Sequence, residues 1–267
     1  MHEELKKTGA ALILFTRLPW HRLFHVESHH FAHAAAYWPF AGWITGSVLG
    51  LTFWLANQYL PTNMAAMLAI AARMLLTGSL HEDGLADYCD GMGGGRNREH
   101  TLRIMKDSHI GTYGVLGLIV YLILFQQAFT FLSENTQNDL TLILRRTLTA
   151  DISAKCSASL LTAMLPYART AEEAKTGTVY APLTRMHAMR LLVALLPVFA
   201  IFCIKDCNMA SFLIPCFTLI LSFATTSLLA LQMRHRLQGY TGDCCGATFL
   251  LSEFAIYTLF CIFFAFY

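Results

Sequence analysis

Long apolar segments, separated by short polar connections, follow one another along most of this chain of 267 residues. Such segments predict transmembrane helices, because about 20 apolar residues cross the hydrocarbon core of a bilayer. Composition agrees, since 55% of the residues are hydrophobic and only 13% are charged. We expect about seven spans, in the ranges 38–56, 64–80, 114–132, 140–165, 191–204, 211–231 and 247–267. The sequence therefore predicts an all-α transmembrane helix bundle that forms one integral membrane domain over residues 1–267.

Lysine and arginine are distributed unevenly between the connections. The connections 57–63, 133–140 and 208–210 contain neither residue, whereas the N-terminal arm and the segments 81–114 and 166–190 contain several. Because basic connections stay in the cytoplasm, seven spans would place all of them on the inner side. We expect a multi-pass protein in the lipid of the cell inner (cytoplasmic) membrane, with a cytoplasmic active site. A net charge of +2, without a polybasic run, argues against a nucleic-acid partner.

The polar segment 81–114 interrupts the apolar pattern. It contains Asp83, Asp87 and Asp90, spaced four and three residues apart. On an α-helix the three carboxylates fall within about 60° of one another and would repel. Mg²⁺ relieves such repulsion, because it binds carboxylate oxygens and keeps coordination positions for phosphate. We therefore predict that these three aspartates are catalytic and bind one or two Mg²⁺ ions, and that one of them, Asp90 in the first instance, acts instead as a base.

Glycines and basic residues follow the aspartates. Gly91 and residues 93–95 are expected to end the helix in a loop whose backbone N–H groups face phosphate oxygens. Arg96, Arg103 and Lys106 could bind a pyrophosphate through charge-assisted hydrogen bonds. Asp107 follows them directly, and Asp243 lies in a second glycine-flanked segment; both are expected to orient metal-bound waters or substrate hydroxyls. Arg98 either binds substrate or faces solvent.

Charged residues also occur inside the apolar segments, where each costs at least about 2–3 kcal/mol if it faces lipid. Arg73 precedes Asp83 by ten residues, and on one continuous helix it would lie roughly 15 Å deeper. Asp151 and Lys155 have helical i, i+4 spacing and are interpreted as a structural ion pair. Glu253 is expected to face the interior of the bundle.

Four histidines, His21, His25, His29 and His33, are spaced four residues apart. On one helix they would share a face and could bind a metal ion. Because no acidic or cysteine cluster accompanies them in the sequence, a solvated helix at the level of the lipid headgroups is the preferred interpretation.

The segment 75–114, LLTGSLHEDGLADYCDGMGGGRNREHTLRIMKDSHIGTYG, closely resembles the signature of the cobalamin synthase (adenosylcobinamide-GDP ribazoletransferase) family. Supporting matches, in the order of the family, are FTRLP at 15–19, AYWPFAG at 36–42, MLPYART at 164–170 and GYTGDCCGA at 239–247. The sequence departs from the family pattern at Cys89, Lys155 and residues 249–250.

The resemblance implies a Mg²⁺-dependent transferase that acts late in cobalamin biosynthesis. Such an enzyme joins adenosylcobinamide-GDP to α-ribazole, or to its 5′-phosphate. The products are adenosylcobalamin, or its 5′-phosphate, and GMP. Mg²⁺ is the one cofactor implied, and a homo-oligomer remains an open expectation.

Two other functions compete with this interpretation. A CDP-alcohol phosphatidyltransferase also carries aspartates on a membrane helix, but its usual pattern has an Ala-Arg pair after D-G-x-x and a longer spacer. A proton-coupled or cation-coupled transporter would place acidic residues near the middle of the membrane in broken helices. The aspartates here lie together beside glycines and arginines, which favours phosphate chemistry.

Overall fold

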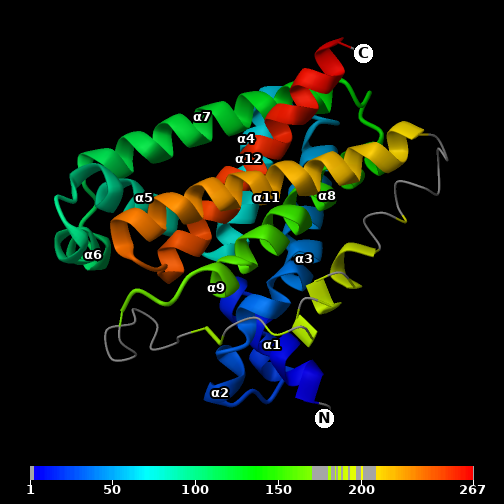
Figure 1. Ribbon diagram of the computed structural model, residues 1–267. Coiled ribbons are helices and arrows are strands. Elements are labelled where there is room, and N and C mark those ends of the chain that lie inside the picture. Colours follow the sequence, from blue (N-terminus) through cyan, green and yellow to red (C-terminus); the bar gives the residue numbers. More distant parts are fainter. Residues whose placement is uncertain are drawn as a thin grey trace.

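The computed structural model describes residues 3–169 and 209–266, together with separate positions between 180 and 200. Its elements are shown in Figure 1 and are, in chain order, α1 (Glu3–Phe15), η1 (Trp20–Arg22), α2 (Ser28–Phe31), α3 (Ala34–Ala56), α4 (Thr62–Thr77), α5 (Leu80–Gly94), α6 (Arg98–Lys106), α7 (Thr112–Glu134), α8 (Leu140–Ser159), α9 (Leu161–Met164), α11 (Met209–Leu237) and α12 (Gly242–Phe266). Within these residues, extended pairing is limited to one isolated bridge between Tyr167 and Tyr240. The predicted all-α class is confirmed.

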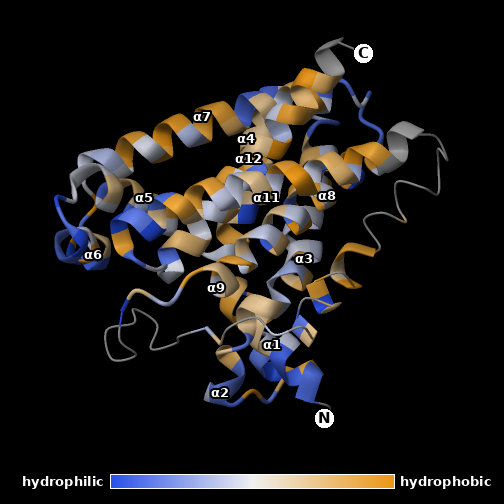
Figure 2. Ribbon diagram, viewed as in Figure 1, coloured by the Kyte–Doolittle hydropathy of each residue, from blue (hydrophilic) through white to orange (hydrophobic). Residues whose placement is uncertain are grey.

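Four of these helices, α3, α7, α11 and α12, are long and apolar enough to cross a membrane. The bent pair α4–α5 would make a fifth span. Figure 2 shows the outer helices α7 and α11 largely in the colours of apolar residues, and α7 exposes Leu116, Val120 and Ile123. Exposed aliphatic side chains on this scale suit lipid rather than water. The helices support a multi-pass membrane protein, although the count of seven spans is not confirmed: the range 191–204 lies mostly outside the described residues.

Helix α8 is the central helix of the bundle, with every residue from Arg145 to Ser159 buried. It packs along α3, whose glycines form the contact face. A Cβ atom on Gly46 would lie 3.1 Å from the backbone oxygen of Thr147, and one on Gly42 would lie 2.9 Å from Asp151 Oδ1. Gly42, Gly46 and Gly50 thus form a close-packing face, because α3 and α8 approach so closely that no side chain fits between them.

Placing leucine at Gly46 is expected to lower the stability of the bundle by about 1–3 kcal/mol, because the added side chain must push α3 away from the α8 backbone. The measurement is the thermal midpoint of the detergent-purified variant. Gly242→Ala is the control, since a Cβ there meets no atom within 4 Å. Equal midpoints for the two variants would contradict the tight packing of α3 on α8.

A buried cluster of charges connects α4, α8 and α12. Arg73 Nη1 lies 2.5 Å from Glu253 Oε1 and 3.9 Å from Asp151 Oδ2. Lys155 forms an ion pair with Asp151, and its Nζ also donates to Thr45 Oγ1 at 2.9 Å. The predicted pairing of Asp151 with Lys155 and the inward position of Glu253 are confirmed. Charges that would be costly in lipid are thus neutralised inside the bundle.

The chain bends sharply between α4 and α5. Gly78 and Ser79 both take left-handed backbone conformations, with φ of 65° and 54°, and the two helices meet at 91°. Gly78 also packs against Arg17, whose Nε would lie 2.1 Å from an added Cβ. The expectation that Arg73 and Asp83 share one continuous helix is therefore wrong. The bend instead directs α5 across the bundle, beside the beginning of α12.

Candidate active site

The three predicted aspartates lie on α5, within one continuous helix, so their shared face is confirmed. Their surroundings differ. Asp83 is exposed, whereas Asp87 and Asp90 are buried, with exposed fractions of 9% and 7%. One end of the acidic face is thus open to substrate, and the other is enclosed by neighbouring helices.

Asp90 connects α5 to the beginning of α7. Its Oδ2 accepts a hydrogen bond from the backbone N–H of Gly111 at 2.7 Å, and its Oδ1 accepts one from Gly114 at 2.8 Å. A Cβ on Gly114 would lie 2.4 Å from Oδ2, and one on Gly111 would lie 2.5 Å from Oδ1. Both glycines therefore leave the space in which Asp90 stabilises the positive end of α7.

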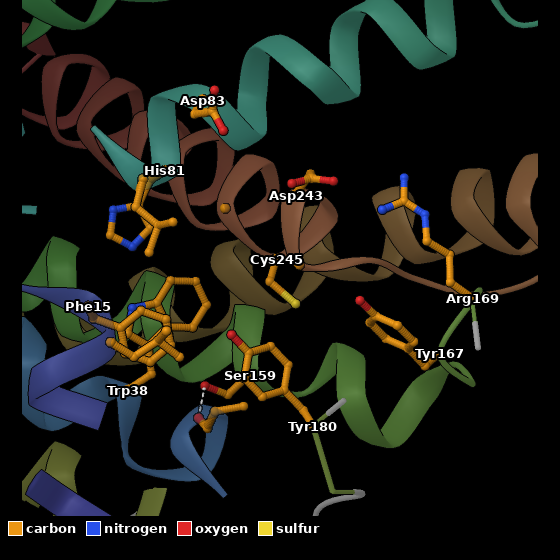
Figure 3. A pocket seen from close by; sticks show the side chains of 15 residues that line it. Phe15, Trp38, His81, Asp83, Ser159, Tyr167, Arg169, Tyr180, Asp243 and Cys245 are labelled. Atoms are coloured by element: carbon orange, nitrogen blue, oxygen red, sulfur yellow. Dashed lines mark hydrogen bonds between the residues drawn. The ribbon is translucent and has the colours of Figure 1, made fainter. Parts of the chain in front are cut away.

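The beginning of α12 crosses α5 at Gly84. A Cβ on Gly84 would lie 3.0 Å from the backbone oxygen of Asp243, and one on Gly246 would lie 3.3 Å from that of His81. Glycine on each helix allows this close approach. As a result, Asp243 lies on the same side of the bundle as Asp83, and both carboxylates line one cavity (Figure 3).

That cavity, which we call the aromatic cavity, has a volume of about 230 Å³. Apolar side chains, Leu14, Phe15 and Trp38 among them, form one part of its wall, while Asp83, Asp243 and Arg169 form a polar part. Its lining residues are Leu14, Phe15, Ala35, Trp38, Leu80, His81, Asp83, Ser159, Tyr167, Arg169, Tyr180, Gly242, Asp243, Cys245 and Gly246. A wall of this mixed kind is typical of small-molecule sites.

A wider hollow, the basic groove, lies between α6 and the segment 166–169. Its volume is about 750 Å³, and it is lined by Arg98, Glu99, Leu102, Arg103, Lys106, Asp107, Tyr167, Ala168 and Arg169. Tyr167 and Arg169 line both the groove and the aromatic cavity, so the two hollows adjoin. The structure thus brings Arg103, Lys106 and Asp107 together, while Arg96 lies with Arg103 in a neighbouring hollow.

Arg98 was expected either to bind substrate or to face solvent, and it instead donates two hydrogen bonds to backbone oxygens. Its Nε donates to the backbone oxygen of Leu237 at 2.9 Å, and its Nη2 donates to that of Ala168 at 2.7 Å. It therefore joins α6 to the end of α11 and to the wall of the groove. Arg169 adds a bond from its Nη2 to the backbone oxygen of Leu102 at 3.0 Å.

Two ionisable groups at the groove have shifted pKa values. Hydrogen bonds from the backbone N–H and the ring of His109 lower the pKa of Asp107. The Asp107 carboxylate therefore stays ionised to a lower pH than an ordinary aspartate. Burial raises the pKa of Tyr167, so its phenol remains a neutral hydrogen-bond donor. The groove therefore carries a fixed negative charge beside its cations.

The glycines after Asp90 do not form the predicted phosphate-binding loop. Helix α5 continues to Gly94, and the N–H of Gly95 bonds to the oxygen of Gly91 at 2.9 Å. The end of the helix presents carbonyl groups, and Arg236 donates to those of Gly95 and Met92 at 2.6 and 3.3 Å. The glycines serve packing instead: a Cβ on Gly91 would lie 2.4 Å from the Met105 side chain.

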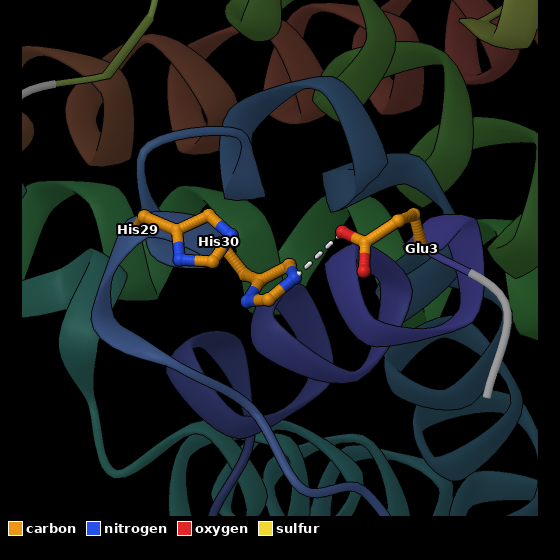
Figure 4. A group of neighbouring side chains, drawn as sticks. All are labelled: Glu3, His29 and His30. Carbon is orange, nitrogen blue, oxygen red and sulfur yellow. Dashed lines mark hydrogen bonds and ion pairs between the residues drawn. The ribbon is translucent and has the colours of Figure 1, made fainter.

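The histidine-rich segment also differs from its predicted form. His21 lies in η1 and His29 in the four-residue α2, so no continuous helix aligns the four histidines. Glu3, His29 and His30 do form a group whose potential ligand atoms lie within 4.8 Å (Figure 4). His30 Nε2 already pairs with Glu3 Oε2 at 3.0 Å, and Lys6 lies 3.3 Å from Glu3 Oε1. Because Lys6 would compete with a metal ion for the Glu3 carboxylate, this group is a weak metal site.

The residues of α5 suit magnesium by their chemistry. Asp83 and Asp243 provide carboxylate oxygens at one cavity, the hard donors that Mg²⁺ prefers over the nitrogen and sulfur donors of zinc sites. Gly84 keeps the side of α5 toward Asp243 free of a Cβ. Among the described residues, the three aspartates of α5 do not bring ligand atoms within 4.8 Å of one another, unlike Glu3, His29 and His30.

Comparison with known proteins identifies the group of proteins to which this architecture belongs. The family model described as cobalamin-5-phosphate synthase matches residues 7–261. The chain belongs to this family. A relative named adenosylcobinamide-GDP ribazoletransferase, from Leptothrix cholodnii, is 37% identical over 249 residues, which cover 92% of this chain and 91% of the relative. Relatives of the same name from Shewanella baltica and Shewanella oneidensis are 32% and 31% identical, over 96% of this chain and 94% of theirs. No solved structure gives a significant match.

Membership of the cobalamin-5-phosphate synthase family confirms the resemblance noted in the sequence. Several residues of the cavity were nonetheless missed by the interpretation of the sequence. Trp38, at the beginning of the expected span 38–56, is 2% exposed and stacks on Phe15, with ring centroids 4.8 Å apart. Tyr167 and Arg169 lie in the matched segment MLPYART, which was the available signal for their place in the site.

Proposed function

We propose that this chain is the transferase that joins adenosylcobinamide-GDP to α-ribazole, or to its 5′-phosphate, and releases GMP. The main support is that a basic groove and an enclosed aromatic cavity adjoin through Tyr167 and Arg169, with Asp83 and Asp243 at the cavity. Two such hollows suit a reaction with two large substrates. The names of the family and of its relatives agree with this function.

In the proposed reaction, a ribazole hydroxyl oxygen attacks the phosphorus atom on the corrinoid side of the pyrophosphate. The anhydride bond to the guanosine phosphate breaks, and GMP leaves with its electron pair. Arg103, Lys106 and Arg169 would hold the pyrophosphate oxygens, as cations around the groove can neutralise the charge of the leaving group. Arg96 would extend this contact toward the neighbouring hollow.

The proton of the attacking hydroxyl has to pass to a carboxylate. Both oxygens of Asp90 accept backbone hydrogen bonds, whereas Asp243 lines the aromatic cavity. We therefore favour Asp243 over Asp90 as the base, and we assign Asp107 to orienting substrate hydroxyls in the groove. A base has to lie within hydrogen-bond reach of the proton that it accepts.

Asp83 and Asp87 would hold Mg²⁺, joined by Asp90 through the lone pairs that its backbone hydrogen bonds leave free. The bound ion would neutralise charge on the pyrophosphate during transfer. We place the protein in the cell inner membrane with this site on the cytoplasmic side, since Arg103, Lys106 and Arg169 surround the groove and basic segments stay inside.

The transporter alternative is not favoured by this geometry. The charges in the middle of the bundle, Arg73, Asp151, Lys155 and Glu253, are paired with one another. The carboxylates that line a cavity lie instead beside a groove with four basic side chains. A paired, solvent-free cluster suits stability better than ion passage.

The experiment is to incubate the detergent-purified protein with adenosylcobinamide-GDP and α-ribazole and to follow GMP release with and without Mg²⁺. We expect release only when both substrates and Mg²⁺ are present, because the ion must offset the charge of the anhydride. Equal release without ribazole would indicate a hydrolase and overturn the transferase assignment. Full activity after EDTA treatment would overturn the magnesium assignment alone.

A further inference from the structure

We propose that the aromatic cavity binds the flat base of the acceptor nucleoside, so that the acceptor occupies this cavity and the nucleotide donor occupies the basic groove. The proposal rests on the proposed function and adds to it which substrate each hollow holds. It follows from the size of the cavity and from the residues of its walls.

The volume of the cavity limits its occupant. At about 230 Å³ it is larger than a cavity of about 150 Å³ that binds benzene, and smaller than the 300 Å³ or so at which pockets for drug-sized ligands begin. A fused two-ring base such as benzimidazole falls in this interval. A corrin macrocycle, with its peripheral amides, is several times larger and cannot be enclosed there.

The walls suit a planar aromatic ligand. Phe15 and Trp38 stack with centroids 4.8 Å apart and planes at 16°. His81 stacks on Trp38 in turn, at 5.4 Å and 13°. These rings lie together at one side of the cavity in Figure 3 and come from three helices, α1, α3 and α5. Parallel rings at a cavity wall offer a surface on which a further ring can stack.

The base of α-ribazole differs from guanine, the other flat base of the reaction, in the number of its polar groups. Guanine presents several donors and acceptors along its edges, each of which needs a partner when buried. Leu14, Phe15 and Ala35 line the cavity with side chains that have no polar atom. The apolar side of the cavity therefore suits the hydrocarbon edge of a benzimidazole better than the polar edges of guanine, and the polar side chains of the lining remain for the sugar.

The opposite wall then receives the sugar. Asp83, Asp243 and Arg169 line the cavity on the side that adjoins the groove, where Figure 3 shows Asp83 and Asp243 facing the same region. Burial raises the pKa of Tyr180, which also lines the cavity and remains a neutral donor. A base enclosed among the rings would direct its ribose hydroxyls toward the carboxylates and the pyrophosphate beyond them.

The test uses a variant that fills the cavity and a variant that reduces its aromatic wall. Ala35→Leu adds three carbon atoms to the lining, and Trp38→Phe replaces the two-ring indole with a single ring. Ala71→Leu is the matched control, because Ala71 is exposed on α4, away from the cavity. For each detergent-purified protein, the KM for α-ribazole and the KM for adenosylcobinamide-GDP are measured at saturating co-substrate, and α-ribazole binding is measured by calorimetry without the nucleotide.

We expect Ala35→Leu to raise the KM and the dissociation constant of α-ribazole at least tenfold, and Trp38→Phe to raise them several-fold. The KM for adenosylcobinamide-GDP should stay within twofold, and Ala71→Leu should match the wild type. A rise confined to adenosylcobinamide-GDP, or no change in either constant, would overturn the proposal. Two measurements separate failure of this proposal from failure of the proposed function. Turnover by the wild-type protein tests the function, whereas calorimetric binding of α-ribazole tests the cavity and needs no turnover.

Discussion

Asp83→Asn is expected to lower kcat for GMP release about 100-fold or more, the loss typical of removing one group that stabilises transition-state charge. Asp83 is the exposed aspartate of α5 and lines the aromatic cavity beside Asp243. The amide is nearly isosteric with the carboxylate, but it carries no charge to bind Mg²⁺. The measurement is steady-state turnover at several Mg²⁺ concentrations, and we expect partial recovery at high Mg²⁺.

Asp139→Asn is the matched control for this variant. Asp139 is the N-cap of α8, where its side chain accepts hydrogen bonds from the backbone N–H groups of Thr141 and Leu142. Asparagine caps helices as well as aspartate does, so activity should be unchanged. Turnover of Asp83→Asn within a factor of three of the wild type would refute the assignment. Asp90 is a less clean test, because asparagine cannot accept the hydrogen bonds of both Gly111 and Gly114.

Asp151→Leu is expected to destabilise the protein by about 3–5 kcal/mol, because removing one partner of a buried ion pair leaves an uncompensated charge. Asp151 is fully buried, pairs with Lys155 and accepts a hydrogen bond from Thr45 Oγ1 at 2.8 Å. Without it, Glu253 has to balance both buried cations, Arg73 and Lys155. The measurement is the thermal midpoint in detergent, with the amount of folded protein in the membrane as a second readout.

The double variant Asp151→Leu/Lys155→Met separates charge from packing. Apolar side chains of similar volume often replace a buried ion pair at little cost, so the double variant should recover most of the lost stability. A double variant as unstable as the single one would show that the geometry of α8, rather than the unpaired charge, causes the loss. A single variant as stable as the wild type would contradict the buried cluster altogether.

The features predicted correctly from the sequence share one property: each depends on residues close together in the chain. Asp83, Asp87 and Asp90 share a face of α5 because helical periodicity places them there. The i, i+4 spacing alone indicated the pair of Asp151 with Lys155. Apolar length and composition indicated helices that can cross a membrane.

The errors arose where a residue distant in sequence changed a local preference. The apolar pattern from 64 to 80 reads as one helix leading into the acidic segment, but the left-handed residues Gly78 and Ser79 break it next to Arg17. Gly91, Gly93, Gly94 and Gly95 suggested a loop, yet the first three remain helical, and the side chains of Met105 and Tyr113 fill the space beside Gly91 and Gly93. Neither contact has a signal within the segment itself.

By itself, the sequence determined an all-α membrane protein with an acidic helix face, because periodicity, length and charge are local quantities. Only the tertiary structure decided that α5 turns 91° from α4, that Asp243 meets Asp83 across Gly84, and that Asp90 holds the beginning of α7. It also assembled the aromatic cavity from α1, α3, α5 and α12. The physical reason is that close packing selects among locally allowed conformations, and the contacts that do so join residues far apart in the sequence, such as Arg73 and Glu253, which are 180 positions apart.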